Sequence, residues 1–375
     1  MQQLPAANHG QDERCFPLHR YLHRRFPVPL KFPLVPWYVR LPVVLFFQRV
    51  RRDIRSISLN CRPYQPGDEH GIFDLYRAVF QLEMTPEHWH WFFQSSPDGP
   101  AAISVMESGG RLVGHYAVLP RGFWFEQRRG IAGLAAGAML LPEARSVPAL
   151  VQLAKLAYEI ARQRGMTWLY AFPRDDSHAV HCKLLGWKAM PKIVEWDGAL
   201  PRGHADSAKN VHVWRQMPAD LDFNDLNPAG DVRAICGLRS TDWLRWRFFD
   251  RPGGEYVLHT IADGRKATAY AVTKRYQRDG VRYGHLLDWR STPAATKDSE
   301  GLLASVWRQL ADDWQVERVS TWAKGRSVLG AVLAGAGLTL TGRNSNFCYF
   351  DVAGVYNEFV EDSAWQLEMA DSDIY

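Results

Sequence analysis

The stretch that decides the fold spans residues 133–172 and reads GLAAGAMLLPEARSVPALVQLAKLAYEIARQRGMTWLYAF. Its opening run to Leu141 is apolar or glycine, which is typical of a buried strand. Apolar residues then recur at helical spacing over 150–161, and Gly165 ends the predicted helix. Residues 168–172 read as a second buried strand. A strand, a helix and a strand in this order predict a mixed α/β unit.

Strand and helix signals continue on both sides of this stretch. Before it, Ser108-Gly-Gly separates two predicted strands, and Thr85-Pro-Glu begins a predicted helix. After it, we expect Asp176 or Ser177 to cap a short helix that stops at Gly186. The other elements predicted for this half are strands at 57–63, 101–106, 111–125 and 133–141, a helix at 72–80, and strands through Leu200.

The second half of the chain repeats this order of elements. Tyr270-Ala-Val matches Tyr116-Ala-Val, and Gly337 ends a short helix as Gly186 does. The offset between matched elements stays between 151 and 154 residues, which chance rarely produces over a whole series. We therefore predict two copies of one unit, joined by a link near 201–227. The matched elements of the second copy are 256–261, 266–275, 283–289, 302–314, 319–323 and 327–336.

Length and composition exclude several classes of protein. A chain of 375 residues has room for two domains, and 46% apolar residues exclude wholesale disorder. The five cysteines form no CxxC pair, so neither a disulfide scaffold nor a structural zinc site is expected. This cysteine usage predicts a cytoplasmic protein with reduced thiols.

Positive charge is concentrated at the N-terminus. Residues 1–55 hold ten Lys/Arg and three Asp/Glu, a net charge of +7. The rest of the chain holds 35 basic and 37 acidic residues, a net charge of −2. A nucleic-acid partner is therefore not expected for the body of the protein.

The basic arm has alternative explanations. Residues 32–47 are almost wholly apolar but are interrupted by three prolines, so they are too short and too broken for a membrane-spanning helix. Four arginines follow between residues 49 and 55. Residues 28–55 could thus contact the anionic inner face of a membrane, pack across the body, or bind a partner protein.

Short motifs occur in a characteristic order along the chain. Residues 141–145 read Leu-Pro-Glu-Ala-Arg, residues 170–173 Tyr-Ala-Phe-Pro, and residues 185–187 Leu-Gly-Trp. The second half carries Trp-Leu-Arg-Trp-Arg-Phe at 243–248, and residues 365–373 read WQLEMADSD. Together these motifs resemble a tandem family of GNAT-like N-acyltransferases that is linked to bacterial exopolysaccharide assembly.

The resemblance implies a fold and a domain organisation. We expect two GNAT-like units in tandem, at 56–200 and 228–352, each a mixed and mostly antiparallel sheet flanked by helices. The arm 1–55 precedes them, a linker 201–227 joins them, and an acidic tail 353–375 follows.

The resemblance also implies an acyl-CoA site. In GNAT enzymes the turn after the fourth strand binds the pyrophosphate of acetyl-CoA or another acyl-CoA, because backbone N–H groups at a helix N-terminus attract anions. That turn lacks the expected glycines here, and Pro148 removes one N–H, so an ordinary helix start is the alternative. No metal is expected. The predicted donor-binding residues are Leu141, Arg145, Ser146, Val147, Ala149 and Ser177.

Acyl transfer to an amine also needs groups that accept and donate protons. The candidates are His115 on the long third strand, His181 on the helix after the fifth strand, and Asp288, which ends the apolar strand of the second copy between leucine and tryptophan residues. Each also has a structural explanation: the histidines as hydrogen-bonded or surface residues, and Asp288 as a cap. Arg245 and Arg247 could bind an anionic sugar or phosphate, or form helical salt bridges.

The function that this reading favours is acyl-CoA-dependent N-acylation of an amino sugar or polysaccharide intermediate, so the expected partner is a small-molecule or glycan acceptor. The first alternative is a non-catalytic GNAT-like module in polysaccharide synthesis. The second is aminoacyl transfer from charged tRNA, against which the net charge of the body argues.

Overall fold

The structure is a computed structural model, and it describes residues 58–125, 128–201, 210–226, 235–324, 327–354 and 365–373. The basic arm 1–55, and with it the predicted membrane contact of residues 28–55, lies outside these residues. No helix in the described ranges is long and apolar enough to cross a membrane.

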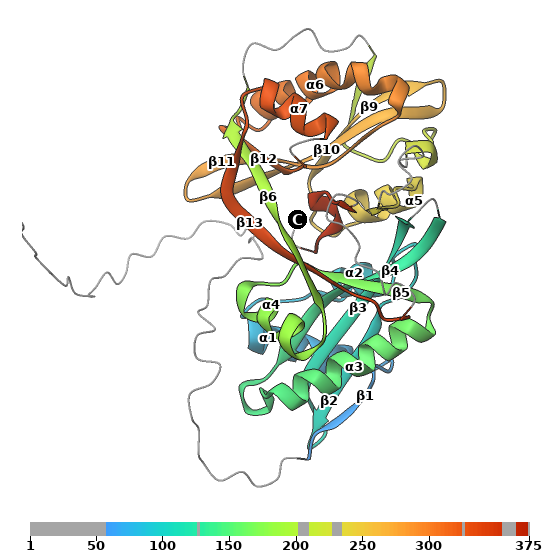
Figure 1. Cartoon of the computed structure of the whole chain (residues 1–375), viewed down its shortest axis with the longest axis vertical. Helices are drawn as coiled ribbons and strands as arrows, with labels where there is room; N and C mark the ends of the chain where they lie inside the picture. Colours follow the sequence, from blue (N-terminus) through green and yellow to red (C-terminus); the bar gives the residue numbers. More distant parts are fainter. Residues whose placement is uncertain are drawn as a thin grey trace, which may run out of the picture. The chain divides into compact units, whose positions relative to one another are not determined.

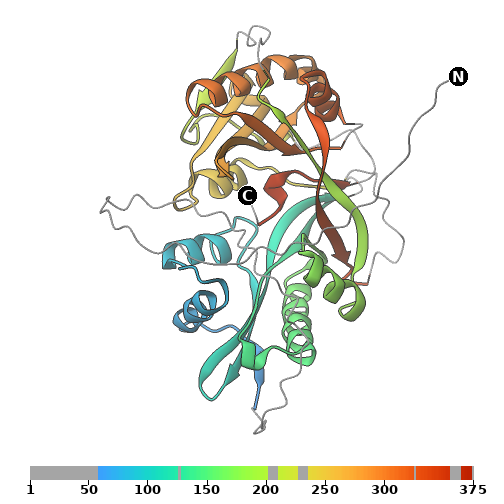
Figure 2. The same ribbon diagram turned by 90° about the vertical axis from the view of Figure 1, so that its left-hand side faces the viewer.

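The first half contains a sheet with helices on both sides (Figures 1 and 2). Helices α1 and α2 lie on one side of its strands and α3 lies on the other (Figure 2). The elements are β1 (Asn60–Pro63), α1 (Glu69–Phe80), α2 (Pro86–Phe93), β2 (Ala102–Ser108), β3 (Arg111–Phe125), β4 (Arg128–Leu140), the short helix η2 (Pro142–Ala144), α3 (Val147–Gln163), β5 (Met166–Ala171), α4 (Asp175–Leu184) and β6 (Lys188–Ala199).

The second half begins with elements of its own and then follows the order seen from β2 to β6. The first group is β7 (Val211–Trp214), η3 (Asn224–Leu226), β8 (Ile235–Gly237), α5 (Thr241–Leu244) and the π-helix η4 (Arg245–Phe249). The second group is β9 (Tyr256–Asp263), β10 (Lys266–Arg278), β11 (Val281–Ser291), η5 (Pro293–Asp298), α6 (Ser299–Asp312), β12 (Arg318–Trp322), α7 (Val328–Gly335) and β13 (Thr339–Phe350). The tail adds β14 (Trp365–Gln366) and η7 (Met369–Asp371).

All the strands except β8 and β14 lie along one continuous path of paired strands, in the order β1-β2-β3-β4-β5-β13-β6-β12-β11-β10-β9-β7. The two halves exchange a strand on this path. Strand β13 of the second half pairs with β5 of the first, and β6 of the first half pairs with β12 of the second. Strands β6 and β13 also pair with each other and run side by side (Figure 1). The predicted fold class, two mixed and mostly antiparallel units flanked by helices, is confirmed.

Local sequence explains where the helices of the first half begin. Thr85 caps α2 by accepting a hydrogen bond from the amide of His88, and Ser146 caps α3 in the same way from Ala149. The predicted cap of α4 is wrong: the helix begins at Asp175, and its N-cap residue Arg174 makes no side-chain capping bond. Two acidic residues in its first turn favour the helix through the dipole instead.

The matched tripeptides Tyr116-Ala-Val and Tyr270-Ala-Val do not occupy equivalent faces. The hydroxyl of Tyr116 lies 3.0 Å from that of Tyr158 on α3. On β10 the residue that contacts the corresponding helix α6 is Thr273, whose hydroxyl donates a hydrogen bond to Gln309. Tyr270 lies on the opposite face of β10, where its hydroxyl donates to Asp288. Side chains alternate along a strand, so a shift of one residue exchanges the faces. The tripeptide match therefore does not mark equivalent positions.

The described parts of two predicted boundary segments belong to the folded body. Strand β7 lies inside the predicted linker 201–227 and pairs with β9. In the tail, Trp365 pairs with β8 through β14, and its side chain packs against Trp168 of β5 at a ring distance of 5.0 Å. Trp365, Met369 and Asp371 are all buried. Residues 365–373 of the acidic tail are therefore packed largely as core.

Candidate active site

Strands β4 and β5 separate in the middle of the first half. They pair in parallel from Ile131 to Leu134 of β4, and β4 then continues to Leu140 alongside β3. The register between β3 and β4 shifts so that Gly137 and Ala138 form a bulge, and Gly137 has a φ of +65° that favours glycine. The bulge thus lies on the part of β4 that is not paired with β5, between the paired segment and the start of α3.

The start of α3 offers few free amides to a phosphate. Arg145 donates its amide to the carbonyl of Pro142, Ala149 donates to the hydroxyl of Ser146, and Pro148 has none. Of the predicted stretch 145–149, this leaves the amides of Ser146 and Val147. The side chains of Arg145 and Ser146 are exposed, and Arg145 reaches back to the carbonyl of Leu140. The turn can thus present one cation and two amides, which is less than a glycine-rich turn would offer.

Two of the other predicted donor residues have structural contacts. Leu141 is buried and donates its amide to the carbonyl of Val113 on β3 at 2.9 Å. Ser177 lies in the first turn of α4, where its carbonyl oxygen accepts a hydrogen bond from Nδ1 of His181 at 2.7 Å. Ser177 therefore positions His181, and Leu141 fixes the end of β4.

His181 ends a buried chain of hydrogen bonds. Burial lowers the pKa of His181, so the ring is neutral near pH 7. Because Nδ1 donates to Ser177, Nε2 must accept, and it lies 3.1 Å from the hydroxyl of Tyr116. Tyr116 in turn accepts from Tyr158, which accepts from the indole of Trp187, both at 3.0 Å. The chain connects β3, α3 and α4 with Trp187, which directly precedes β6, and its hydrogens point from Trp187 toward His181.

His115 lies on the opposite face of β3 and supports the bulge. Its Nδ1 donates to the carbonyl of Gly137 at 2.7 Å, and its ring packs edge-on against Phe93 of α2. Burial lowers its pKa to about 4, so it too is neutral near pH 7. Among the described residues, Nε2 of His115 has no hydrogen-bond partner. A buried acceptor of this kind needs an explanation, and a proton-accepting role is one.

Asp288 lies in the second half within an ion-pair network. Its carboxylate accepts from Nε of Arg239 at 2.9 Å and from the hydroxyl of Tyr270 at 2.7 Å. Arg239 also pairs with Asp371 at 2.9 Å and with Glu368 at 3.4 Å. Burial alone would lower the pKa of Arg239, but these carboxylates raise it well above its ordinary value. The network fully accounts for Asp288, and no contact in the described ranges joins it to His115 or His181.

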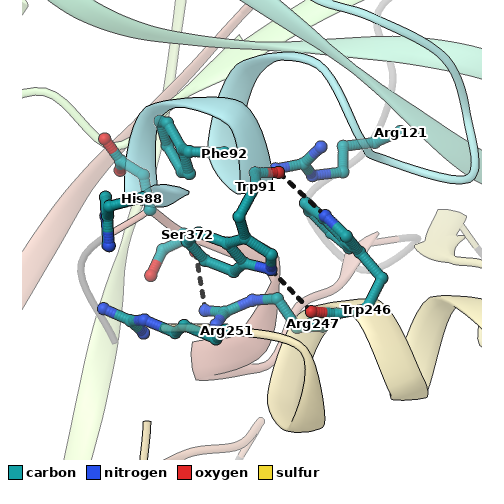
Figure 3. A pocket seen from close by; sticks show the side chains of 9 residues that line it. His88, Trp91, Phe92, Arg121, Trp246, Arg247, Arg251 and Ser372 are labelled. Atoms are coloured by element: carbon teal, nitrogen blue, oxygen red, sulfur yellow. Dashed lines mark hydrogen bonds between the residues drawn. The ribbon is translucent and has the colours of Figure 1, made fainter. Parts of the chain in front are cut away.

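Sequence reasoning missed a pocket lined by arginine and tryptophan side chains (Figure 3). Trp91 of α2 and Trp246 of η4 stack at a ring distance of 5.5 Å, and each indole donates to the other's carbonyl. Arg121 of β3 lies over the ring of Trp246 and Arg251 over that of Trp91. The residues that complete it are His88, Phe92, Arg247, Ser372 and Asp373.

Arg245 and Arg247 have different surroundings in the structure. Arg245 is half-exposed and forms the helical salt bridge with Asp242. Arg247 is buried and lines the pocket, where it donates to the carbonyls of Ala370 and Ser372. The arginine-rich segment was thus the one sequence signal for this pocket. Its other members come from distant segments that no local pattern connects.

Comparison with known proteins identifies the class of the first half. Residues 60–189 match the family model described as Acetyltransferase (GNAT) domain, so the first half contains a GNAT acetyltransferase domain. These residues include β4, the bulge and α3. No curated protein matches the chain in sequence.

Solved structures extend the likeness to both halves. A probable N-acyltransferase from Enterococcus faecalis V583 is 14% identical with a TM-score of 0.59, covering 79% of this chain and 73% of its own. A GCN5-related N-acetyltransferase from Anabaena variabilis is 12% identical with a TM-score of 0.57 and the same coverage. A tandem GNAT protein from the clavulanic acid biosynthesis pathway is 16% identical with a TM-score of 0.51, covering 79% and 99%. Identities this low show a shared fold.

Within the described ranges, no group of three or more His, Cys, Asp or Glu residues could hold a metal ion.

Proposed function

We propose that this protein is an acyl-CoA-dependent N-acyltransferase whose donor lies between β4 and β5. The observation that carries the proposal is that the GNAT-domain match at 60–189 covers β4, β5 and α3, with β4 and β5 paired only over Ile131–Leu134 of β4. The pyrophosphate would lie on the amides of Ser146 and Val147, with Arg145 as the cation, and the thioester would extend along the unpaired part of β4.

The reaction needs two proton transfers beside the thioester. The acceptor amine attacks the carbonyl carbon, the new C–N bond replaces the C–S bond, the amine loses a proton and the CoA thiolate gains one. In our proposal Nε2 of His115, next to the bulge, takes the amine proton, and His181 gives the proton to the thiolate, a step that requires its Nδ1–H to leave the carbonyl of Ser177. The role predicted for Asp288 is the least supported of the three, since Arg239 and Tyr270 occupy its carboxylate.

For the acceptor we propose an amino sugar or a polysaccharide intermediate. The support is the resemblance of the motifs to the exopolysaccharide-linked family, together with a pocket that combines arginines and aromatic rings on the α2 side of the first-half sheet. Aromatic rings and guanidinium groups are common components of sites for sugars that carry charge.

Calorimetric titration with acetyl-CoA and with longer acyl-CoAs tests the proposed donor site. Arg145→Glu places a negative charge where phosphates would lie, and we expect it to weaken binding by about 10-fold or more. Lys155→Glu changes the charge by the same amount at an exposed position further along α3 and should leave binding unchanged. Equal affinities for the two variants would move the donor elsewhere.

The non-catalytic module remains the second candidate, and the start of α3 favours it. Arg145 and Ala149 already use their amides and Pro148 has none, so this turn is a poor phosphate site. Absence of binding for every acyl-CoA at millimolar concentration would support the module over the enzyme.

A further inference from the structure

Strand β13 of the second half presents alternate side chains to helix α4 and to the segment that follows it. Nδ2 of Asn346 donates a hydrogen bond to Oδ1 of Asp175 in the first turn of α4, at 2.9 Å. Four residues further along the strand, the ring of Phe350 stacks on that of Trp187 at a ring distance of 6.0 Å. Because side chains alternate along a strand, Cys348 lies on this same face, between Asn346 and Phe350.

Helix α4 carries a matching row of residues. Asp175, His178 and Cys182 are spaced three and four residues apart, so they lie on one face of the helix. This face is directed at β13, since Asp175 contacts Asn346. The thiol of Cys182 forms a hydrogen bond with that of Cys348, and both cysteines are free. Two thiols from different halves of the chain therefore meet between α4 and β13.

The two thiols differ in exposure and in acidity. Cys348 is fully buried, and burial raises its pKa well above the ordinary value. Burial also raises the pKa of the half-buried Cys182, but its hydrogen bond with Cys348 acts in the opposite direction. Nε2 of His178 lies 3.5 Å from Sγ of Cys182 and can accept its proton, and a neighbouring imidazolium favours a thiolate. Cys182 is therefore the thiol that reacts first.

We propose that Cys182 and Cys348 form a reversible disulfide when the protein reacts with a hydroperoxide. The Cys182 thiolate attacks the O–O bond of hydrogen peroxide, an S–O bond forms, and the hydroxide that leaves takes the proton held by His178. The sulfur of Cys348 then attacks the sulfenic acid, the S–S bond forms, and the second hydroxide leaves with the proton of Cys348. Two thiols lose two electrons and two protons, and the peroxide becomes two molecules of water.

The disulfide would join α4 to the strand that the second half contributes to the sheet of the first. It would close a loop from residue 182 to residue 348, and closing a long loop stabilises a fold by restricting the unfolded chain. Helix α4 also carries His181, so the bond would fix the helix that holds this side chain. The site goes beyond acyl transfer, because neither thiol takes part in the proposed reaction.

Peptide mapping of the full chain tests the proposal directly. The protein is treated with one equivalent of hydrogen peroxide, its remaining thiols are alkylated, and it is digested with trypsin without reductant. Cleavage at lysine and arginine places the two cysteines in peptides 175–183 and 344–375, each of which contains one cysteine. We expect these peptides to be recovered joined, and dithiothreitol to separate them. Their recovery as separate alkylated or sulfonic acid peptides would overturn the proposal.

A pair of variants separates this disulfide from other oxidation. Cys182→Ser should abolish the joined peptides, whereas Cys61→Ser, at a half-buried cysteine on β1, should leave them unchanged. Peroxide should raise the melting temperature of the parent and of Cys61→Ser by about 5 °C or more, and dithiothreitol should reverse the rise. An equal rise in Cys182→Ser would show that the stabilisation comes from another reaction and would contradict the proposed bond.

His178 is tested by separating rate from yield. His178→Gln should slow the appearance of the joined peptides by about 10-fold and leave their final yield unchanged, because the imidazole accepts a proton and is no part of the bond. His90→Gln, at an exposed position on α2, should leave the rate unchanged. Equal rates for the two variants would overturn the assignment of His178 as the proton acceptor.

Discussion

The two halves of the molecule follow one order of elements but differ at the point where the fourth strand leaves the fifth. In the first half, β4 pairs with β5 as far as Leu134 and then carries small and apolar residues past the bulge at Gly137. In the second half, β11 pairs with β12 as far as Leu286 and then carries the buried charges of Asp288 and Arg290.

Those charges connect the second half to the tail. Arg290 pairs with Glu368 at 2.9 Å, and Asp288 pairs with Arg239, which also holds Asp371. Buried charges that are already matched by protein partners have no need of a ligand. The comparison therefore assigns a structural role to this region of the second half, and it supports the first half as the place for an acyl donor.

The largest effect is expected from removing the central cation of the second half. Arg239→Met leaves Asp288 and Asp371 buried without their partner, and we expect it to reduce the free energy of unfolding by about 3–5 kcal/mol. Chemical denaturation measures this change. Arg265→Met removes an exposed pair with Asp220 and should cost at most about 1 kcal/mol. A similar small loss for both variants would mean that the network is not a structural centre.

A smaller effect is expected at the seam of β4 and β5 in the first half. At Gly133 an added Cβ would lie 2.3 Å from Cγ1 of Val118 and 2.7 Å from Cδ2 of Leu169. Gly133→Ala should therefore lower the free energy of unfolding by about 1–3 kcal/mol through overpacking. At Gly130, on the same strand, an added Cβ would meet nothing within 4 Å, so Gly130→Ala is the matched control. Equal stabilities would show that the strands separate readily at this point.

The order of the elements could be predicted from the sequence because its signals are local. The apolar run before Leu141, the helical spacing after Leu150 and the glycine at 165 each lie within a few residues of the element that they define. The match of Tyr116 with Tyr270 was wrong for the same reason. Two identical short sequences do not show the register in which each strand pairs, and so do not show which face of the sheet a side chain occupies. A shift of one residue moved the side chain to the other face.

The exchange of β6 and β13 and the arginine pocket depend on contacts between distant parts of the chain. Strand β5 pairs with β4 of its own half on one side and with β13 on the other, and nothing near residue 170 specifies β13 as that second neighbour. The pocket brings together Trp91, Arg121, Trp246 and Asp373, which lie on four separate segments. The burial of Glu368 and Asp371 in the acidic tail depends on distant residues in the same way, because Arg290 and Arg239 pair with them.

The smallest effect concerns pH and compares one buried histidine from each half. Burial lowers the pKa of His115 in the first half and of His259 in the second to about 4. An unfolded histidine has a pKa near 6.5, so between about pH 6.5 and pH 4 the unfolded state binds the extra proton. Each histidine therefore contributes stability that is fully present above pH 6.5 and is lost as the pH falls toward 4.

The size of this loss follows from the two pKa values. Between pH 7.5 and pH 5.5 each histidine should remove about 1 kcal/mol from the free energy of unfolding. His115→Gln and His259→Gln should each flatten the decline measured by urea denaturation at the two pH values by that amount, whatever they do to stability at pH 7.5. His70→Gln, an exposed position on α1, is the control for the substitution itself. The contradicting result is a decline that His115→Gln leaves as steep as in the parent while His259→Gln flattens it. In that case His115 is accessible to protons in the folded state, and the bulge at Gly137 is open to solvent, unlike the corresponding core of the second half.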